Sequence, residues 1–292
     1  MFPPSLLEKL KTPFGTYRRE EVGHADVYHV SKPHAFVQAA GYLKHVLSKR
    51  NKCAVLYRGQ PDLYGCHLVP TLYRSTRSQE GKSKQDHALS AYLSAISAKE
   101  VLKPVGEYAR EPLLQHYGIK TKWLDLVDNA WVALWFACHE ANPSRDLGKY
   151  VHFSRRHPSL NPRRMSYAYI LLVRADLVPP DVEQPGLFVG PSTSLIDLRV
   201  AAPSTFLRPH AQHALLLKRA TGLDHHHIDY SDFVVGVIRV NLVQALDWLG
   251  SGSLLSAHSL FPPPAYDFGY HNLLEYSPTG NAAIGTIHQI CP

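Results

Sequence analysis

Apolar residues recur at helical spacing in four parts of the chain. In residues 34–50 an apolar stripe ends in a basic turn that suits a helix C-terminus. A second helix is expected over about 86–103, and a third, running through His139, after a cap at Asp128 or Asn129. The segment 243–255 predicts a fourth helix with a glycine stop.

Shorter apolar runs between these helices predict strands. An edge strand is expected at 24–30, a strand closed by a glycine at 53–60, and β-rich runs at 166–177 and 232–242. Strands before and after a helical middle favour an α+β fold. We therefore expect a single domain with a mixed or mostly antiparallel central sheet flanked by helices.

The domain is expected to span residues 25–280. Residues 1–24 resemble a loose N-terminal arm and residues 281–292 a C-terminal tail. Within the domain, 75–85 and 141–165 are polar, and the second is punctuated by prolines, so both are predicted to be loops.

The composition is that of a globular protein, with 45% hydrophobic and 19% charged residues among 292. No apolar run approaches the length of a membrane-spanning helix, and the first residues show no secretion signal. The four cysteines are scattered, which argues against a disulfide framework or a zinc ribbon. We expect a reduced, cytoplasmic protein that contacts no membrane and needs no metal.

A formal net charge of +7, together with 18 histidines, favours polyanionic partners or phosphate-bearing ligands. The basic residues form separate clusters at 74–84, 154–164 and 217–227, and each cluster alone is typical of a solvated surface. Adjacent histidines at 225–227 suit metal chelation poorly, because neighbours in a strand point to opposite faces. A surface loop is predicted there.

The first candidate for chemistry is the strand end Tyr57-Arg58-Gly59-Gln60. Arginine suits bidentate recognition of phosphate, a tyrosine ring can stack on a base, and glycine lets the backbone approach a ligand. The alternative is structural: Arg58 pairs with a buried carboxylate, and Gly59 turns the chain.

The second candidate is the polar run before the third helix, which is richer in hydrogen-bonding groups than a connecting turn needs. Its members are Gln115, His116, Tyr117, Thr121 and Asp125. The alternative is a buried polar network that braces Arg58, with Asp125 as its counter-ion. The helix after Asn129 is predicted to be core.

Two further candidates are Ser192, in a Ser-Thr-Ser turn before a strand, and Gln212, before an apolar run. The chain has no GxGxxG, P-loop, HExxH or GxSxG motif, which argues against the commonest nucleotide-binding and hydrolase classes.

Taken in order, these segments resemble the FRG-domain family, named for its aromatic–Arg–Gly motif. The matching blocks are Tyr57-Arg58-Gly59-Gln60, Val69-Pro70-Thr71-Leu72-Tyr73-Arg74, Gln115-His116-Tyr117-Gly118, Thr121-Lys122-Trp123-Leu124-Asp125 and Val132-Ala133-Leu134-Trp135-Phe136-Ala137, then Arg208, Gln212 and Leu260-Phe261-Pro262. The chain departs from the pattern where Pro-Thr-Arg-Leu-Leu-Asp-Trp becomes Lys-Thr-Lys-Trp-Leu-Asp-Leu at 120–126. It departs again at His213 and Ala214, which replace a glycine and a phenylalanine.

The resemblance implies a bacterial or phage protein of toxin or phage-defence type. The aromatic–Arg–Gly strand is also similar to the first motif of the Arg–Ser–Glu class of ADP-ribosyltransferases, which implies an ADP-ribosyltransferase-like fold with NAD as co-substrate. In that class the arginine holds the NAD pyrophosphate, and a Ser-Thr-Ser turn like that at Ser192 supports the nicotinamide site.

By this analogy Arg58 clamps the pyrophosphate, Tyr57 or Tyr117 stacks on a ring, and His116 binds ribose hydroxyls. The carboxylate that stabilises the oxocarbenium-like state is Asp125 or Glu275. The cofactor-binding set is Tyr57, Arg58, Gly59, Gln60, Gln115, His116, Tyr117, Thr121, Ser192 and Gln212.

The expected acceptor is a nucleic acid or a protein, and an antitoxin or immunity protein is an expected partner. One alternative is a non-catalytic nucleotide- or nucleic-acid-binding module. A second is a nuclease, although metal-dependent nucleases need clustered carboxylates, which the sequence does not display.

Overall fold

The structure is a computed structural model of the chain. The structure describes residues 19–22, 25–76, 78–144, 150–160, 165–220, 228–250, 252, 254–278 and 283–291. The predictions for residues 1–18 of the arm and for the histidines at 225–227 lie outside the described residues.

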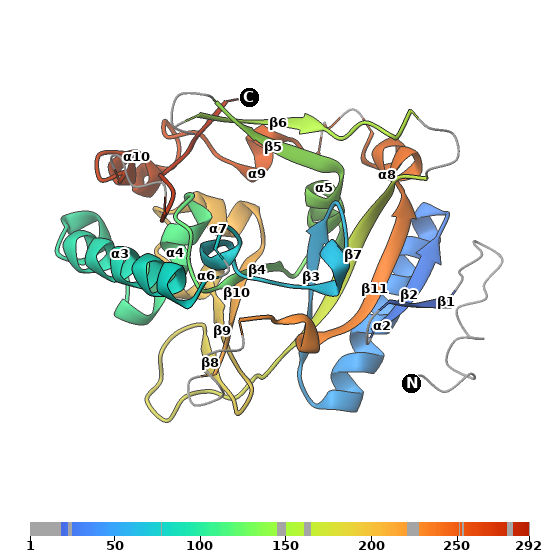
Figure 1. Ribbon diagram of the computed structural model, residues 1–292, viewed down its shortest axis with the longest axis horizontal. Coiled ribbons are helices and arrows are strands. Elements are labelled where there is room, and N and C mark those ends of the chain that lie inside the picture. The colour runs from blue at the N-terminus through green and yellow to red at the C-terminus, as the bar shows by residue number, and fades with distance from the viewer. Residues whose placement is uncertain are drawn as a thin grey trace.

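A nine-stranded mixed sheet forms the centre of the molecule (Figure 1). In sheet order its strands are β1 (Arg19–Val22), β2 (Ala25–Val30), β11 (Val234–Asn241), β7 (Tyr167–Ala175), β3 (Ala54–Gln60), β4 (Leu124–Val127), β10 (Ala214–Arg219), β9 (Thr193–Asp197) and β8 (Leu187–Val189). Among these described strands, β2 and β11 pair in parallel and the other neighbours are antiparallel. The predicted α+β class with a mostly antiparallel sheet is confirmed.

The strands at the centre are covered on both faces, so their sequences are apolar runs without alternation. In β7, Ile170 and Leu172 pack into one core cluster while Leu171 and Val173 pack into another on the opposite face. This double burial explains why residues 166–177 were recognisable as a central strand.

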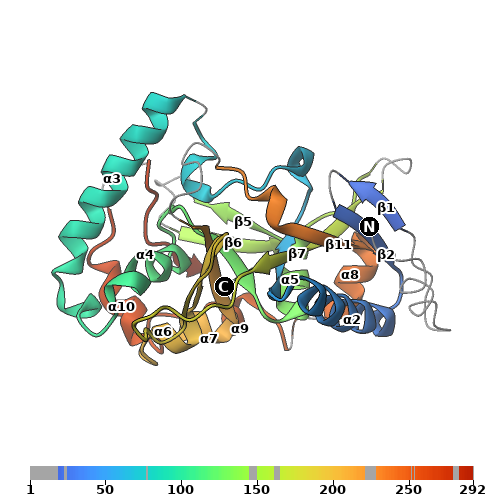
Figure 2. The same cartoon turned by 90° about the horizontal axis from the view of Figure 1, so that it is seen from below.

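Helices lie along the sheet in two groups (Figure 2). The described helices are α2 (Pro33–Asn51), α3 (Gln79–Ser97), α4 (Glu107–His116), α5 (Ala130–Cys138), α6 (Leu198–Ala201), α7 (Leu207–Ala211), α8 (Leu242–Leu249), α9 (Ala257–Leu260) and α10 (Phe268–Leu274), with 3-10 turns η1 (Tyr64–Cys66), η2 (Thr71–Tyr73), η3 (Glu100–Leu102) and η4 (Ser231–Phe233). Helices α2, α5 and α8 cover β3, β7 and β11, whereas α4, α6 and α7 pack around β10 and its neighbours.

Helix α5 begins as the sequence predicts. The side chain of Asn129 accepts hydrogen bonds from the backbone N–H groups of Trp131 and Val132, which would otherwise lack partners. The helix is apolar on nearly every side because it lies between the sheet and the other helices, and Trp135 is 1% exposed. The core assignment after Asn129 is therefore confirmed.

Three segments differ from the predictions. Helix α3 begins at Gln79, inside the loop expected at 75–85, because the Ser78 hydroxyl caps it by accepting from Gly81 N. The loop expected at 141–165 contains most of a hairpin, β5 (His139–Pro143) and β6 (Tyr150–Arg155). Strand β5 is largely exposed, and β6 mixes exposed positions with the buried Val151 and the part-buried Phe153, so neither is a continuous apolar run.

The segments expected to be a tail and a sheet edge both pair with further strands. Strand β12 (Gln289–Cys291) pairs with β6 and completes a second, three-stranded sheet. Ile284 and Ile287 in the same C-terminal segment are buried in the core. At the other end β2 is covered by β1, a strand within the predicted arm, so β2 is not the edge of the sheet.

Candidate functional site

The site residues come together where β3 and β4 separate. These two strands pair at one position, Tyr57 opposite Val127, and the chain then leaves room between the end of β3 and the start of β4. Because side chains alternate along a strand, Tyr57 and Gly59 face α5, and Arg58 and Gln60 face the other side.

Tyr57 is a core residue. Its hydroxyl donates to the carbonyl oxygen of Ala40 at 2.9 Å, and burial raises the pKa of the phenol to about 12. The ring lies inside the cluster beneath α2 and α5, so it is not available to stack on a ligand.

Gly59 is required by the packing of β3 against α5. A Cβ atom at this position would lie 1.7 Å from the carbonyl oxygen of Ala133, a backbone atom of the helix. The close approach is therefore to a helix and not to a ligand, and Gly59 lies within β3 and does not turn the chain.

Arg58 is half-buried in the space between the strands. Its Nη1 donates to the backbone carbonyl of Asp125 at 2.7 Å, whereas its Nε is buried with no hydrogen-bond partner among the described residues. Burial, reinforced by the positive charge of Arg74, lowers the pKa of the guanidinium to about 10. Two neighbouring cations and an unused donor form a site that an anion would complement.

His116 joins Asp125 to the end of α7. Its Nδ1 lies 3.1 Å from Oε1 of Gln212, and the Gln212 amide nitrogen donates to the carbonyl of Leu260 at 2.9 Å. The amide orientation makes Nδ1 the protonated nitrogen of a neutral His116, so Nε2 carries the lone pair, and it is buried without a hydrogen-bond partner among the described residues. Nε2 is 3.9 Å from Oδ1 of Asp125, and the two side chains are 4% and 39% exposed, respectively.

Gln115 and Thr121 brace the turn between α4 and β4. The Thr121 hydroxyl donates to the Gln115 side-chain oxygen and accepts from the backbone N–H of Trp123 at 3.1 Å. Both side chains are buried, so they support the position of Asp125 and do not face solvent.

Tyr117 and Arg208 form a buried cluster behind His116. The Tyr117 hydroxyl donates to Asp267 at 2.8 Å, and burial raises the pKa of this phenol well above its ordinary value. The guanidinium of Arg208 lies 4.4 Å from the Tyr117 ring centre, and its Nη1 donates to the carbonyl of His116 at 2.7 Å. Tyr117 is therefore not available for stacking, and Arg208 positions His116.

Ser192 and Glu275 lie apart from this group. Ser192 N donates to Asp176 at 2.8 Å, and Asp176 follows β7 near the first residue of β3, about 13 Å along the strand from Arg58. Glu275 is exposed at the end of α10, which lies beside α3 and far from β3 (Figure 1). Of the predicted residues, the structure thus brings together Arg58, His116, Asp125 and Gln212.

Arg74 and Arg208 were not among the predicted site residues. Both stood within matching blocks of the resemblance, and a signal for Arg208 was its position between apolar residues, where a cation needs a specific partner. Gln60 is also buried and lines a pocket on the face of the sheet opposite α5.

His116 gives the protein a pH-dependent stability. Burial lowers its pKa below the ordinary 6.5, so the unfolded chain binds more protons there than the folded chain. Above pH 6.5, His116 is neutral in both states and does not lower the free energy of unfolding. As the pH falls through 6.5 towards the pKa of His116 in the folded state, the unfolded chain binds protons that the folded chain does not, and the free energy of unfolding decreases. His116→Gln should therefore lose less unfolding free energy than the wild type between about pH 7.5 and 5.5, measured by urea denaturation. His152→Gln, at an exposed position of β6, should behave as wild type; an equal loss in all three proteins would contradict the prediction.

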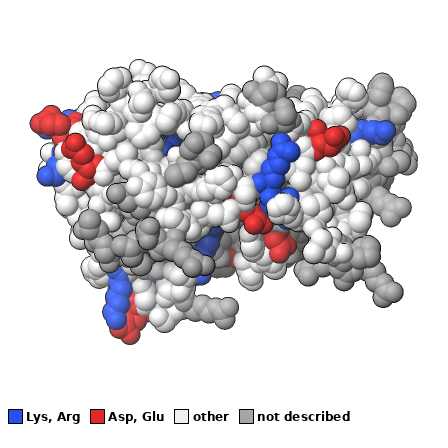
Figure 3. All heavy atoms as spheres, turned by 90° about the horizontal axis from the view of Figure 1, so that it is seen from above, with Lys and Arg blue, Asp and Glu red and all other residues white. Residues whose placement is uncertain are grey.

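The described surface shows neither a basic patch on the face in Figure 3 nor a cluster suited to a metal ion. On the face in Figure 3, the described Lys and Arg side chains lie singly or beside acidic ones and do not gather into a basic patch. No group of three or more His, Cys, Asp or Glu side chains in the described ranges is placed to hold a metal ion. Within the same ranges, no helix is long and apolar enough to cross a membrane.

Comparison with known proteins gives one match. Residues 53–146 match the family model of the FRG domain. No curated protein and no solved structure matches the chain. Gln212 and Leu260, which hold His116 from outside the matched segment, belong to the later blocks of the resemblance. The FRG-domain family is thus supported over residues 53–146, the segment that contains Arg58, His116 and Asp125.

Proposed function

We propose that the protein is an NAD-dependent ADP-ribosyltransferase that modifies a nucleic acid or a protein. The observation that carries the proposal is the group of Arg58, Asp125 and His116. Arg58 keeps an unused donor while it contacts the backbone carbonyl of Asp125, and the part-exposed carboxylate of Asp125 lies 3.9 Å from Nε2 of a neutral His116. The FRG resemblance adds the expectation of a toxin or phage-defence setting, with an antitoxin or immunity protein as partner.

Arg58 binds the pyrophosphate in this proposal. A guanidinium can donate two parallel hydrogen bonds to phosphate oxygens, and its Nη1 is already fixed by the carbonyl of Asp125 at 2.7 Å. The phosphate charge would also offset the repulsion between Arg58 and Arg74, which lowers the pKa of Arg58.

Asp125 supplies the negative charge for the reaction. The bond between nicotinamide and C1′ of ribose breaks, and its electron pair leaves with nicotinamide. The resulting oxocarbenium-like ribose is stabilised by the carboxylate of Asp125, and a nucleophile of the acceptor forms the new bond to C1′. The proton of that nucleophile passes to Asp125. The position of Asp125 beside Arg58 favours it over Glu275 for this role.

His116 orients the ribose. Because Gln212 keeps the proton on Nδ1, Nε2 can accept a hydrogen bond from a ribose hydroxyl. Burial lowers the pKa of the ring, so it stays neutral at physiological pH and retains that lone pair.

The proposal is tested by the binding and consumption of NAD. NAD should raise the melting temperature of the wild type, and Arg58→Ala should lose most of that rise because the pyrophosphate loses its bidentate partner. Arg155→Ala, in the exposed β6 strand, is the matched control and should keep the shift. If wild type and Arg58→Ala both leave NAD and a mixture of DNA, RNA and protein acceptors unchanged, the transferase function is excluded.

A non-catalytic nucleotide- or nucleic-acid-binding module is the second candidate. The unused donor of Arg58 beside the positive charge of Arg74 fits this candidate as well, because binding of a phosphate needs no catalytic carboxylate. Association that weakens steeply with salt, without consumption of NAD, would support this function.

A further inference from the structure

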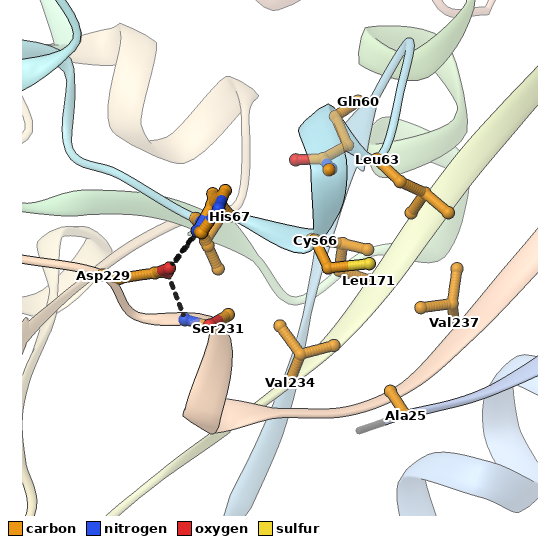
Figure 4. A pocket seen from close by; sticks show the side chains of 12 residues that line it. Ala25, Gln60, Leu63, Cys66, His67, Leu171, Asp229, Ser231, Val234 and Val237 are labelled. Atoms are coloured by element: carbon orange, nitrogen blue, oxygen red, sulfur yellow. Dashed lines mark hydrogen bonds and ion pairs between the residues drawn. The ribbon is translucent and has the colours of Figure 1, made fainter. Parts of the chain in front are cut away.

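A small pocket lies beside the proposed catalytic group. It has a volume of about 210 Å³ and lies between β2, β3, β7, β11 and the segment around η1 (Figure 4). Its walls are mainly apolar and include Ala25, Leu63, Leu171, Val234 and Val237. An apolar cavity of about 150 Å³ holds a benzene ring, so this volume suits a planar ring with a substituent.

Gln60 gives this pocket a polar group that has no hydrogen-bond partner among the described residues. Its side chain lines the pocket and is 5% exposed, yet its amide makes no hydrogen bond to any described residue. In Figure 4 no interaction joins it to the other side chains drawn. The amide atoms are not fully buried, so they face the space of the pocket. A ligand that presents a donor beside an acceptor would satisfy both of its groups.

Asp229, the carboxylate at the pocket, already has hydrogen-bond partners within the protein. Asp229 accepts from the backbone N–H groups of Leu68 and Ser231, both at 2.9 Å, and lies 2.6 Å from Nδ1 of His67. This arrangement ties the segment around η1 to η4 and so fixes the pocket wall. The hydrogen-bonding capacity for a ligand therefore lies mainly with Gln60.

We propose that this pocket receives a nitrogen heterocycle of a nucleotide, held by Gln60 through an edge with a donor beside an acceptor. Adenine and the carboxamide of nicotinamide both present such an edge. Gln60 and Arg58 lie on the same face of β3, two residues and so about 7 Å apart along the strand, which suits a base and a phosphate of one nucleotide. The inference rests on the phosphate-binding role proposed for Arg58.

Cys66 allows a direct test, because it lines the same pocket. Alkylation of Cys66 by iodoacetamide is followed by peptide mass spectrometry in the presence of AMP, nicotinamide mononucleotide or pyrophosphate. Cys53 is a free cysteine that packs against the cluster on the opposite face of the sheet, so its labelling is an internal control.

One of the two nucleotides should slow the labelling of Cys66 several-fold without changing that of Cys53, and the effective nucleotide identifies the heterocycle. Gln60→Met keeps the length of the side chain but removes both hydrogen-bonding groups. It should raise the nucleotide concentration needed for protection by about tenfold or more. Its melting temperature should stay close to that of wild type, because methionine fills a similar volume and the amide of Gln60 makes no hydrogen bond to a described residue.

The inference is overturned if neither nucleotide protects Cys66 at millimolar concentration, if pyrophosphate alone protects it equally, or if Gln60→Met keeps full protection. The wild-type comparison decides the first two outcomes even if the variant does not fold. Protection of Cys66 without consumption of NAD would leave the pocket established and would contradict the transferase activity alone.

Discussion

Asp125→Asn is expected to lower the rate of NAD consumption by about 100-fold or more, while NAD affinity changes little. Asparagine keeps the shape of the side chain but cannot stabilise positive charge on the ribose or take up the acceptor proton. The backbone carbonyl of Asp125, which accepts from Arg58 Nη1 at 2.7 Å, is retained, so the phosphate clamp should stay in position. The measurements are nicotinamide release at saturating NAD and the NAD-induced shift in melting temperature.

Asp128→Asn is the matched control. Asp128 follows β4 three residues after Asp125, and its side chain is 35% exposed, close to the 39% of Asp125. It pairs with Lys44 and, at 3.7 Å, with Arg199, and both partners lie outside the proposed site. Similar rates for the two variants, or an unchanged rate for Asp125→Asn, would remove Asp125 from the reaction.

Gly59→Ala is expected to destabilise the protein by about 3 kcal/mol or more, or to prevent folding. The new Cβ would lie 1.7 Å from the carbonyl oxygen and 2.7 Å from the carbonyl carbon of Ala133. These are backbone atoms in the middle of α5, so relief requires the whole helix to move away from β3. Urea denaturation at neutral pH measures the loss.

Gly41→Ala is the control, because a side chain added at Gly41 would meet no other part of the protein. A Cβ at Gly41, on the exposed side of α2, would have no atom within 4 Å. Alanine favours a helix over glycine by about 1 kcal/mol, so this variant should be slightly more stable than wild type. If Gly59→Ala is as stable as Gly41→Ala, the backbone of β3 does not lie against α5 as closely as the structure has it.

Several elements could be predicted from the sequence because their signals are local. Helix α5 has its cap in Asn129, and the apolar run of β7 is long enough to identify a strand buried on both faces. The hairpin β5–β6 and the start of α3 could not be predicted in the same way. Most side chains of β5 and of the first turns of α3 are exposed or half-buried, and β6 also pairs with β12, which lies more than a hundred residues later in the chain.

The sequence by itself determined which residues are candidates for chemistry: the aromatic–Arg–Gly strand and the polar run around His116 and Asp125. Residue type and order carry that information. Only the tertiary structure decided their roles, because the direction of a side chain depends on which elements pack against it. Tyr57 and Tyr117 have the same motif status as Arg58 and His116, yet helices and neighbouring rings enclose them in the core. By contrast, β3 and β4 separate after one paired position. Arg58 therefore lies beside Asp125, and its Nε has no hydrogen-bond partner among the described residues.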